Sequence, residues 1–304
     1  MKLAQPATAG EDAGRMFPAE PGRELLMLLR ILTLNVQNDE GDARRQKILN
    51  AGLRQIAPDL VAFQEVGFGP GRSQLEGLLE GTGLRGTHQA GVLAYDMPFA
   101  DRYGGAAVAT RWPHRVVEVL DQRRADAPDV PWCTLATSIA VPGLGEVLFI
   151  ATTFSWRLNA ESARERQAVA LTDLDARHRG ALPTILAGDF NAGPEAASIR
   201  FLSGLQSLGG RSVHYHDAWA VAGDGPGHTW TDENEGARDE IAALVGQPGH
   251  RRRLDYVFVG SRDAHPEASC RIEAARLAFD QPTDGVWPSD HFGVLVELEL
   301  TAPA

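Results

Sequence analysis

The chain has 304 residues, of which 43% are hydrophobic and 23% charged, and it contains 32 Gly, 18 Pro and only 2 Cys. This is the composition of an ordinary globular protein, and it excludes disordered, fibrous and disulfide-stapled classes. The 29 Lys and Arg against 40 Asp and Glu give a formal net charge of -11. This balance disfavours a broad, sequence-independent grip on nucleic acid, because such a grip relies on Lys and Arg to release counterions. It suits a site that gathers divalent cations.

Residues 1–28 are predicted to form a flexible leader, because the segment as far as Gly22 is rich in Ala, Pro, Gly and acidic residues. The apolar run from Glu24 to Leu34 is interrupted by Arg30 and is too short to span a bilayer. It also lies behind acidic residues, too far into the chain for a signal peptide. We therefore expect a soluble cytoplasmic protein with no membrane segment and no obligate protein partner.

Short apolar runs alternate with amphipathic stretches along the rest of the chain, without an internal repeat. Apolar runs bounded by Pro and Gly predict strands, and apolar residues at helical spacing predict helices. Helices are expected over 42–56, 74–80, 160–178 and 195–202. Strands are expected over 30–36, 59–65, 103–110, 115–120, 132–141, 146–153, 183–188, 254–260 and 292–300.

Two further patterns bear on the organisation of the chain. The last predicted strand alternates apolar and polar residues, so one of its faces should meet solvent. Residues 232–253 form the only long polar connection, and loops of that length in compact domains tend to be functional or disordered. Because no shift in composition marks a boundary, we expect one domain over residues 29–304, with two sheets sandwiched by helices.

Acidic and amide side chains, together with one histidine, stand where the predicted strands begin or end. In chain order these residues are Asn35, Glu65, Asp189, Asn191, Asp255, Asp290 and His291. Oxygen-rich clusters at strand ends suit a hard divalent cation such as Mg²⁺, which takes one or two carboxylates and keeps several waters. The pattern therefore points to a metal site.

Each of these features also has a purely structural interpretation. Asn35 can cap a turn, and Glu65 can be a solvated residue at a strand edge. The segment from Gly188 to Asn191 can form an Asx-turn, and Asp255 can pair with one of the three arginines before it. The tripeptide that ends in His291 is expected by chance in many chains. No single feature carries a functional conclusion.

Taken in order, the motifs around these residues resemble those of the endonuclease/exonuclease/phosphatase superfamily. That group includes pancreatic-type deoxyribonucleases, abasic-site endonucleases, inositol-polyphosphate 5-phosphatases, neutral sphingomyelinases and deadenylases. The resemblance runs from about Leu32 to Leu300 and implies an α/β fold, a four-layer sandwich of two mainly antiparallel β-sheets flanked by helices. The motifs are Leu34-Asn35, Phe63-Gln64-Glu65, Gly188-Asp189-Phe190-Asn191, Leu254-Asp255-Tyr256 and Ser289-Asp290-His291-Phe292-Gly293-Val294.

The resemblance implies metal-dependent hydrolysis of a phosphodiester or phosphomonoester by direct attack of an activated water. Glu65 resembles the principal metal ligand of the family, with Asn35 and Asp290 in or near the same coordination sphere. The expected cofactor is Mg²⁺ or Mn²⁺. The expected partner is a phosphoester substrate, either a nucleic acid or a small phosphorylated molecule.

The catalytic roles are carried over in the same way. Asp189 resembles the residue that orients or deprotonates the attacking water, and Asn191 resembles a donor to the scissile phosphate. His291 resembles the catalytic histidine of the family, and Asp255 the acid that fixes its imidazole. A histidine with an ordinary pKa near 6.5 exchanges a proton at neutral pH, and an acid partner sets its tautomer.

Weaker motifs accompany these residues. The segment from Gly104 to Pro113 resembles a family strand and turn, and Arg164 with Gln167 matches an Arg-x-x-Gln spacing on a helix. A solvated helix face is the alternative interpretation of that pair. Arg111 and residues 251–253 are expected to form a small basic rim.

One residue departs from the family pattern. Where Thr-His-Leu is usual, this chain has Thr153-Phe154-Ser155, and a phenyl ring cannot donate a hydrogen bond to phosphate. We expect a local replacement for the donor, either Arg157 or the hydroxyl of Thr153 or Ser155. The alternative is a metal-binding pseudoenzyme or binding protein of the same fold with impaired turnover.

Overall fold

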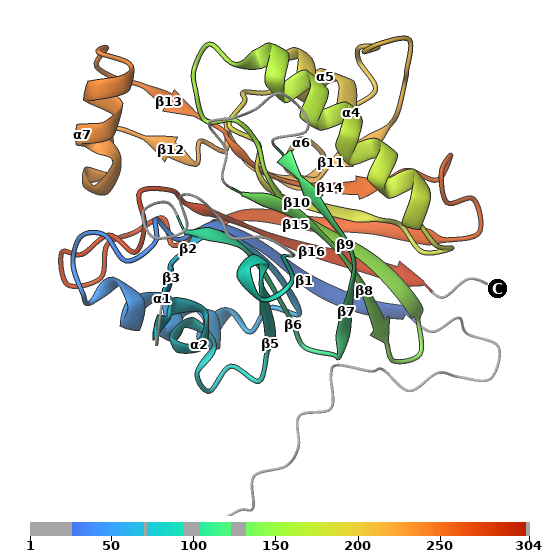
Figure 1. Ribbon diagram of the computed structural model, residues 1–304, viewed down its shortest axis with the longest axis horizontal. Coiled ribbons are helices and arrows are strands. Elements are labelled where there is room, and N and C mark those ends of the chain that lie inside the picture. The colour runs from blue at the N-terminus through green and yellow to red at the C-terminus, as the bar shows by residue number, and fades with distance from the viewer. Residues whose placement is uncertain (1–25, 70–71, 94–103, 123–131, 302–304) are drawn as a thin grey trace, which may run out of the picture.

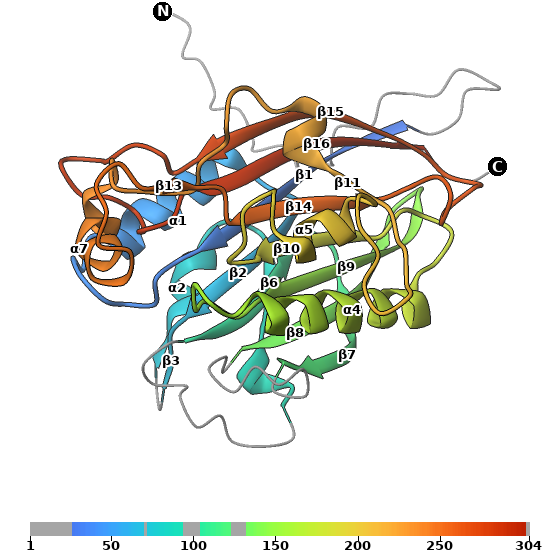
Figure 2. The same cartoon turned by 90° about the horizontal axis from the view of Figure 1, so that it is seen from above.

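Two six-stranded sheets packed face to face, with helices on both outer faces, form the body of the protein (Figures 1 and 2). The computed structural model describes residues 26–69, 72–93, 104–122 and 132–301. The predicted four-layer α/β sandwich is confirmed. The leader as far as residue 25, and residue 103 of the third predicted strand, lie outside the described residues.

The first sheet has the strand order β15-β16-β1-β2-β6-β5. Only its β1–β2 pair is parallel, and the other neighbours are antiparallel. The β1–β2 register places Asn35 beside Gln64, at the ends of the two strands. The strands are β1 (Leu26–Asn35), β2 (Leu60–Val66), β5 (Arg85–His88), β6 (Gly105–Thr110), β15 (Ser269–Ala278) and β16 (Gly293–Thr301).

The second sheet has the same plan, with the order β11-β14-β10-β9-β8-β7 and one parallel pair, β9–β10. Asp189 at the end of β10 pairs with Thr153 on one side and with Asp255 on the other. The strands are β7 (His114–Asp121), β8 (Cys133–Val141), β9 (Gly145–Thr153), β10 (Ile185–Asp189), β11 (Tyr215–Asp217) and β14 (Asp255–Gly260).

Helices close the sandwich on both sides (Figure 1). α1 (Arg45–Ile56) and α2 (Gln74–Leu79) cover the first sheet, and α4 (Glu161–His178) and α5 (Ala197–Leu202) cover the second. α7 (Glu235–Leu244) stands on an arm built by the β12–β13 pair. The remaining elements are β3 (Phe68–Gly69), β4 (Arg72–Ser73), η1 (Gln89–Gly91), α6 (Ala218–Ala222), β12 (Trp230–Thr231) and β13 (Arg251–Arg252).

The core lies between the two sheets and under the helices. Because side chains alternate along a strand, β1 sends Ile31 toward the second sheet and Leu32 toward α1, and both are fully buried. Ile31 shares the central cluster with Phe149 and Val257 of the second sheet. Full burial of such a side chain contributes about 1.5–3 kcal/mol, so the apolar runs of β1, β9 and β14 hold the sheets together.

The structure also differs from the expected elements. β1 begins at Leu26, so residues 26–28, expected in the leader, pair with β16. β15 was not predicted, because only two of its ten residues are buried and four of its apolar residues are small Ala or Cys side chains. The connection over 232–253 contains α7, in which only Ala237 and Ile241 are buried. The solvent-facing side chains predicted for the last strand are confirmed, since Leu295, Glu297 and Glu299 are half-buried.

No helix among the described residues is long and apolar enough to cross a bilayer.

Candidate active site

The two parallel strand pairs end side by side, and their ends carry the polar residues. Asn35 at the end of β1 links the sheets, because its Nδ2 donates to Glu65 Oε1 at 3.1 Å and to Asp189 Oδ2 at 3.4 Å. Asn35 and Asp189 are buried, at 1% and 2% exposed, and Glu65 is half-buried. Asn35 therefore does more than cap a turn.

The Glu65 backbone is held in an uncommon conformation. Its φ of 57° is left-handed, at a point where the register between β2 and β6 shifts. Such conformations persist only where the surroundings enforce them, and they cluster at functional sites. Gly104 provides the space, since a Cβ there would lie 2.5 Å from the Glu65 carbonyl carbon. The glycine of the Gly104–Pro113 motif thus permits the turn that points Glu65 into the site.

Asp189 and Asn191 form a compact turn after β10. The backbone N–H of Asn191, a residue with φ of 51°, donates to Asp189 Oδ1 at 2.9 Å. The Asx-turn that the sequence offered as a structural interpretation is therefore present. The same turn orients the second carboxylate oxygen of Asp189 toward Asn35. The Asn191 side chain donates to the Phe154 carbonyl at 3.2 Å.

His291 is paired with a buried acid. Its Nδ1 lies 2.9 Å from Asp255 Oδ2, and Asp255 is 1% exposed at the start of β14. The Asp255 N–H donates to the Thr229 hydroxyl at 3.2 Å. The alternative pairing of Asp255 with an arginine is wrong, because the nearest of the three, Arg253, forms its ion pair with Asp217.

The loop that carries Asp290 is tied to both β1 and α7. Ser289 Oγ donates to the Asn35 carbonyl at 2.7 Å and to Asp290 Oδ1 at 3.1 Å. Asn234, which caps α7, donates through Nδ2 to the carbonyls of Ser289 and Asp290 at 2.8 and 3.0 Å. The Ser-Asp-His tripeptide is thus placed by specific hydrogen bonds and is not a chance match.

Burial and like charge shift the pKa values of these groups. Burial raises the pKa of Glu65 to about 8, and the charge of Asp290 adds to the shift. Burial raises the pKa of Asp189 to about 7, with Asp255 as the next cause. Burial alone lowers the pKa of His291, but the charges of Asp255 and Asp189 raise it well above its ordinary value. Additional positive charge at the site would favour the ionised carboxylates.

Two groups of residues offer ligands for a metal ion. Ligand atoms of Asp189, Asp255 and His291 lie within 4.8 Å of one another. However, the His291–Asp255 hydrogen bond already uses an imidazole nitrogen and a carboxylate oxygen. Glu65 and Asp290 instead offer oxygen ligands, and their mutual repulsion is what a divalent cation relieves. The second group therefore fits Mg²⁺ or Mn²⁺ better, with Asn35 behind it holding Glu65.

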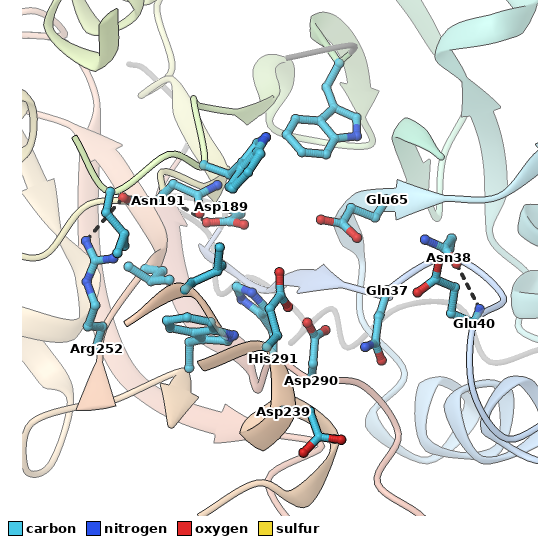
Figure 3. A pocket seen from close by; sticks show the side chains of 18 residues that line it. Gln37, Asn38, Glu40, Glu65, Asp189, Asn191, Asp239, Arg252, Asp290 and His291 are labelled. Carbon is cyan, nitrogen blue, oxygen red and sulfur yellow. Dashed lines mark hydrogen bonds between the residues drawn. The ribbon is translucent and has the colours of Figure 1, made fainter. Parts of the chain in front are cut away.

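These residues surround a pocket of about 490 Å³ (Figure 3). Five of the seven predicted site residues line it, whereas Asn35 and Asp255 lie behind and contact the lining residues Glu65 and His291. The structure therefore brings all seven together. Figure 3 shows Glu65 and Asp189 on facing walls. The five lining residues are Glu65, Asp189, Asn191, Asp290 and His291.

Several pocket residues were missed by sequence reasoning or were not predicted as site residues. Arg252 of β13 lies beside Asn191, with its Nη2 3.4 Å from the Asn191 carbonyl. Burial lowers the pKa of Arg252, and Asp189 opposes that shift. The run of three arginines was visible in the sequence, but the register of β13 decides which one faces the pocket. The others are Gln37, Asn38, Glu40, Trp132, Trp156, Leu158, Trp230, Gly236, Asp239, Glu240, Leu244 and Leu254.

Phe154 does not line the pocket. Its ring is fully buried in the cluster under α4, with its centroid 4.8 Å from that of Phe190. The expected replacement donors, Thr153, Ser155 and Arg157, are not among the lining residues either. The Arg157 guanidinium lies over the Trp156 ring, 5.3 Å from its centroid.

Two other sequence interpretations need correction. Arg164 and Gln167 are buried, so their helix face is not solvated. Arg164 donates to the carbonyls of Ser155 and Arg157 at 3.0 and 2.7 Å, and Gln167 Oε1 accepts from the Ser155 N–H at 3.0 Å. This pair fixes the loop after β9.

Arg111 takes no part in a basic rim. It forms an ion pair with Asp59 just before β2. The register places Thr110 beside Leu60, at the opposite end of β2 from Glu65. The expected rim is thus reduced to Arg252 at the pocket.

Fold and site together define a class: an α/β sandwich whose strand ends gather carboxylates, amides and a paired histidine. A family model described as "Endonuclease/Exonuclease/phosphatase family" matches residues 32–291, and the chain belongs to this family. Comparison with curated proteins finds no match.

Solved structures share the fold. TDP2 of D. rerio in complex with a single-strand DNA product has a TM-score of 0.65 and 18% identity, covering 89% of this chain and 98% of that chain. The human Nocturnin catalytic domain with bound sulfate has a TM-score of 0.62 and 19% identity, covering 90% and 94%. An endonuclease/exonuclease/phosphatase from Beutenbergia cavernae has a TM-score of 0.60 and 23% identity, covering 93% and 72%.

The raised pKa of Glu65 predicts how metal-free stability depends on pH. The folded state holds a proton up to about pH 8, whereas an unfolded Glu releases it near pH 4.5, so stability is lost as the pH rises through this range. Glu65→Gln removes this titration. In chelator-containing buffer we expect the variant to melt at least about 3 °C above the wild type at pH 8.5 and close to it at pH 5.

Melting curves across this pH range, with the exposed Glu76→Gln as control, measure the effect. Parallel slopes for the wild type and Glu65→Gln would contradict the account of the buried carboxylate.

Proposed function

We propose that this protein is a divalent-metal-dependent phosphoesterase that hydrolyses a phosphodiester or phosphomonoester by direct attack of water. The observation that carries the proposal is the convergence of Glu65, Asp290 and Asp189 with the His291–Asp255 pair in one pocket. Phosphoryl transfer needs positioning and charge neutralisation more than covalent chemistry, and this set of groups supplies both.

In this proposal Glu65 and Asp290 would hold Mg²⁺ or Mn²⁺, and Asn35 would complete the site from behind by positioning Glu65. The bound ion would polarise a phosphate oxygen and neutralise developing charge. Asp189 accepts a proton from the attacking water, since its carboxylate faces the pocket and is fixed by the Asn191 N–H.

Two other side chains are proposed to donate hydrogen bonds to the phosphate. Asn191 lines the pocket and donates one amide hydrogen to the Phe154 carbonyl, so its other N–H is proposed to serve the phosphate. His291, kept protonated by Asp255, donates to a phosphate or leaving-group oxygen. Asp255 acts through the imidazole and does not touch the substrate.

Arg252 is proposed as the donor that compensates for Phe154. It is the only Lys or Arg side chain among the described residues that line the pocket. It lies next to Asn191, the residue expected to face the phosphate. A guanidinium is always charged, and its fork matches two phosphate oxygens. Arg252 thus provides a donor that Arg157, stacked on Trp156, does not.

Hydrolysis of bis-(p-nitrophenyl) phosphate tests the function. We expect turnover with Mn²⁺ that is abolished by chelator and restored by added metal. His291→Ala should remove most activity, and adding Asp255→Ala should cost little more, because residues acting as one unit give non-additive losses.

If the folded wild type binds Mn²⁺ but cleaves no phosphoester, the pseudoenzyme alternative replaces this proposal. Strict multiplication of the two losses would contradict a shared role of His291 and Asp255.

Arg252→Ala is expected to lower kcat/KM by about 10²–10³-fold, as for loss of one preorganised donor to a developing anion. Arg252→Lys should recover only part of this, since an ammonium lacks the fork. The matched control is Arg251→Ala, because Arg251 precedes Arg252 on β13 and pairs with Glu233 outside the pocket lining. Equal effects of the two alanine variants would show that Arg252 contributes only general charge.

A further inference from the structure

The pocket carries an unusual charge balance for a phosphate site. Six carboxylates and one guanidinium line it among the described residues. Three of the acids, Glu65, Asp189 and Asp290, have roles in the proposed chemistry. The other three are Glu40, which follows β1, and Asp239 and Glu240 of α7.

The one guanidinium among the described lining residues lies at one end of the pocket, because the three consecutive arginines diverge. Arg251 pairs with Glu233, and Arg253 is buried against Asp217, 2.7 Å away. Arg252 alone reaches the pocket, beside Asn191. The run of basic residues before β14 therefore offers cationic contact to about one phosphate group.

Negative charge lies at the other end. In Figure 3, Glu40 lies beyond Glu65 as seen from Arg252, and Asp239 lies below Asp290. Their carboxylates form no hydrogen bond or ion pair with the residues that the structure describes, and both side chains are exposed. Among the described residues, the cation that the structure places near Glu40 is Arg45, which donates to backbone carbonyls and does not line the pocket. Glu40 and Asp239 therefore present negative charge to anything that extends from the phosphate subsite toward α7.

We propose that the substrate of this site is a small phosphoester that brings a single phosphate group into the pocket, and that the α7 side rejects the further phosphates of an extended polynucleotide. The proposal rests on the phosphoesterase function above. One guanidinium serves one phosphate, while Glu40 and Asp239 repel a second. Tight binding of a polynucleotide needs many Lys and Arg contacts to its phosphates, and this pocket lacks them.

The pocket size agrees with this substrate class. A cavity of about 490 Å³ falls within the range that encloses small molecules. Half-buried Trp156 and buried Trp132 add apolar surface for the uncharged part of the molecule. The pocket thus suits a molecule in which one phosphate is attached to an apolar or uncharged group.

The test compares two substrates that share one nucleoside: the p-nitrophenyl ester of thymidine 5′-monophosphate and a fluorescent oligothymidylate of ten nucleotides. We expect the wild type with Mn²⁺ to have at least tenfold higher kcat/KM on the small ester. The double variant Glu40→Gln/Asp239→Asn should raise the ratio of oligonucleotide to small-ester kcat/KM by about threefold to tenfold, because it removes two charges that repel the further phosphates of the oligonucleotide.

The matched control, Glu76→Gln/Glu80→Gln, removes the same net charge from exposed residues outside α7 and the pocket lining and should leave the ratio unchanged. Fluorescence anisotropy should show tighter oligonucleotide binding by the pocket variant than by the control. A wild type that cleaves the oligonucleotide better, or a pocket variant that matches the control, overturns the substrate class but not the function. A wild type that cleaves neither substrate overturns the function, and this inference with it.

Discussion

The structure depends on holding several carboxylates together in a buried place where their charges repel one another. Glu65 and Asp290 come from opposite ends of the chain, and Asp189 comes from the other sheet. Asn35 joins the two sheets by donating to both Glu65 and Asp189. Burial, and then the charge of Asp290, raise the pKa of Glu65. Ionising this carboxylate within the cluster therefore costs free energy. Such a cluster is unfavourable alone and becomes favourable when a cation enters it.

Much of the surrounding structure can be understood as support for this cluster. Gly104 leaves room for the left-handed turn at Glu65. Asn234 ties the loop of Asp290 to the start of α7. Arg164 binds the carbonyls of the loop after β9 from behind. These contacts fix the side chains before any ligand arrives, and preorganisation of this kind is what phosphoryl transfer requires.

The sequence allowed prediction of the fold class and of all seven clustered residues, because short motifs in a fixed order stand at strand ends. It failed where the outcome depends on tertiary packing. Phe154 looked like a lost donor, yet its side chain belongs to the core under α4 and only its backbone contacts Asp189 and Asn191. Arg252 was indistinguishable from its neighbours, since the strand register alone selects which arginine faces the pocket.

The sequence patterns also did not predict α7. Its apolar positions Ala237, Ile241 and Leu244 span only about two helical turns within a long polar segment, which is too short a stripe to predict a helix. Because α7 lies beside the pocket, Asp239 becomes a lining residue. The sequence alone showed only a single acid in a polar loop. The substrate preference inferred above therefore depends on an element that only the fold reveals.

The position of the bound cation decides which side chains are ligands and which act on the substrate. Anomalous diffraction from a crystal of the protein soaked in Mn²⁺ measures this directly, because the anomalous signal locates the ion independently of the protein model. We predict one strong peak between Glu65 and Asp290, within coordination distance of oxygen atoms of both, with the His291–Asp255 hydrogen bond retained. A peak among Asp189, Asp255 and His291 with that hydrogen bond broken, and none beside Glu65, would contradict the account.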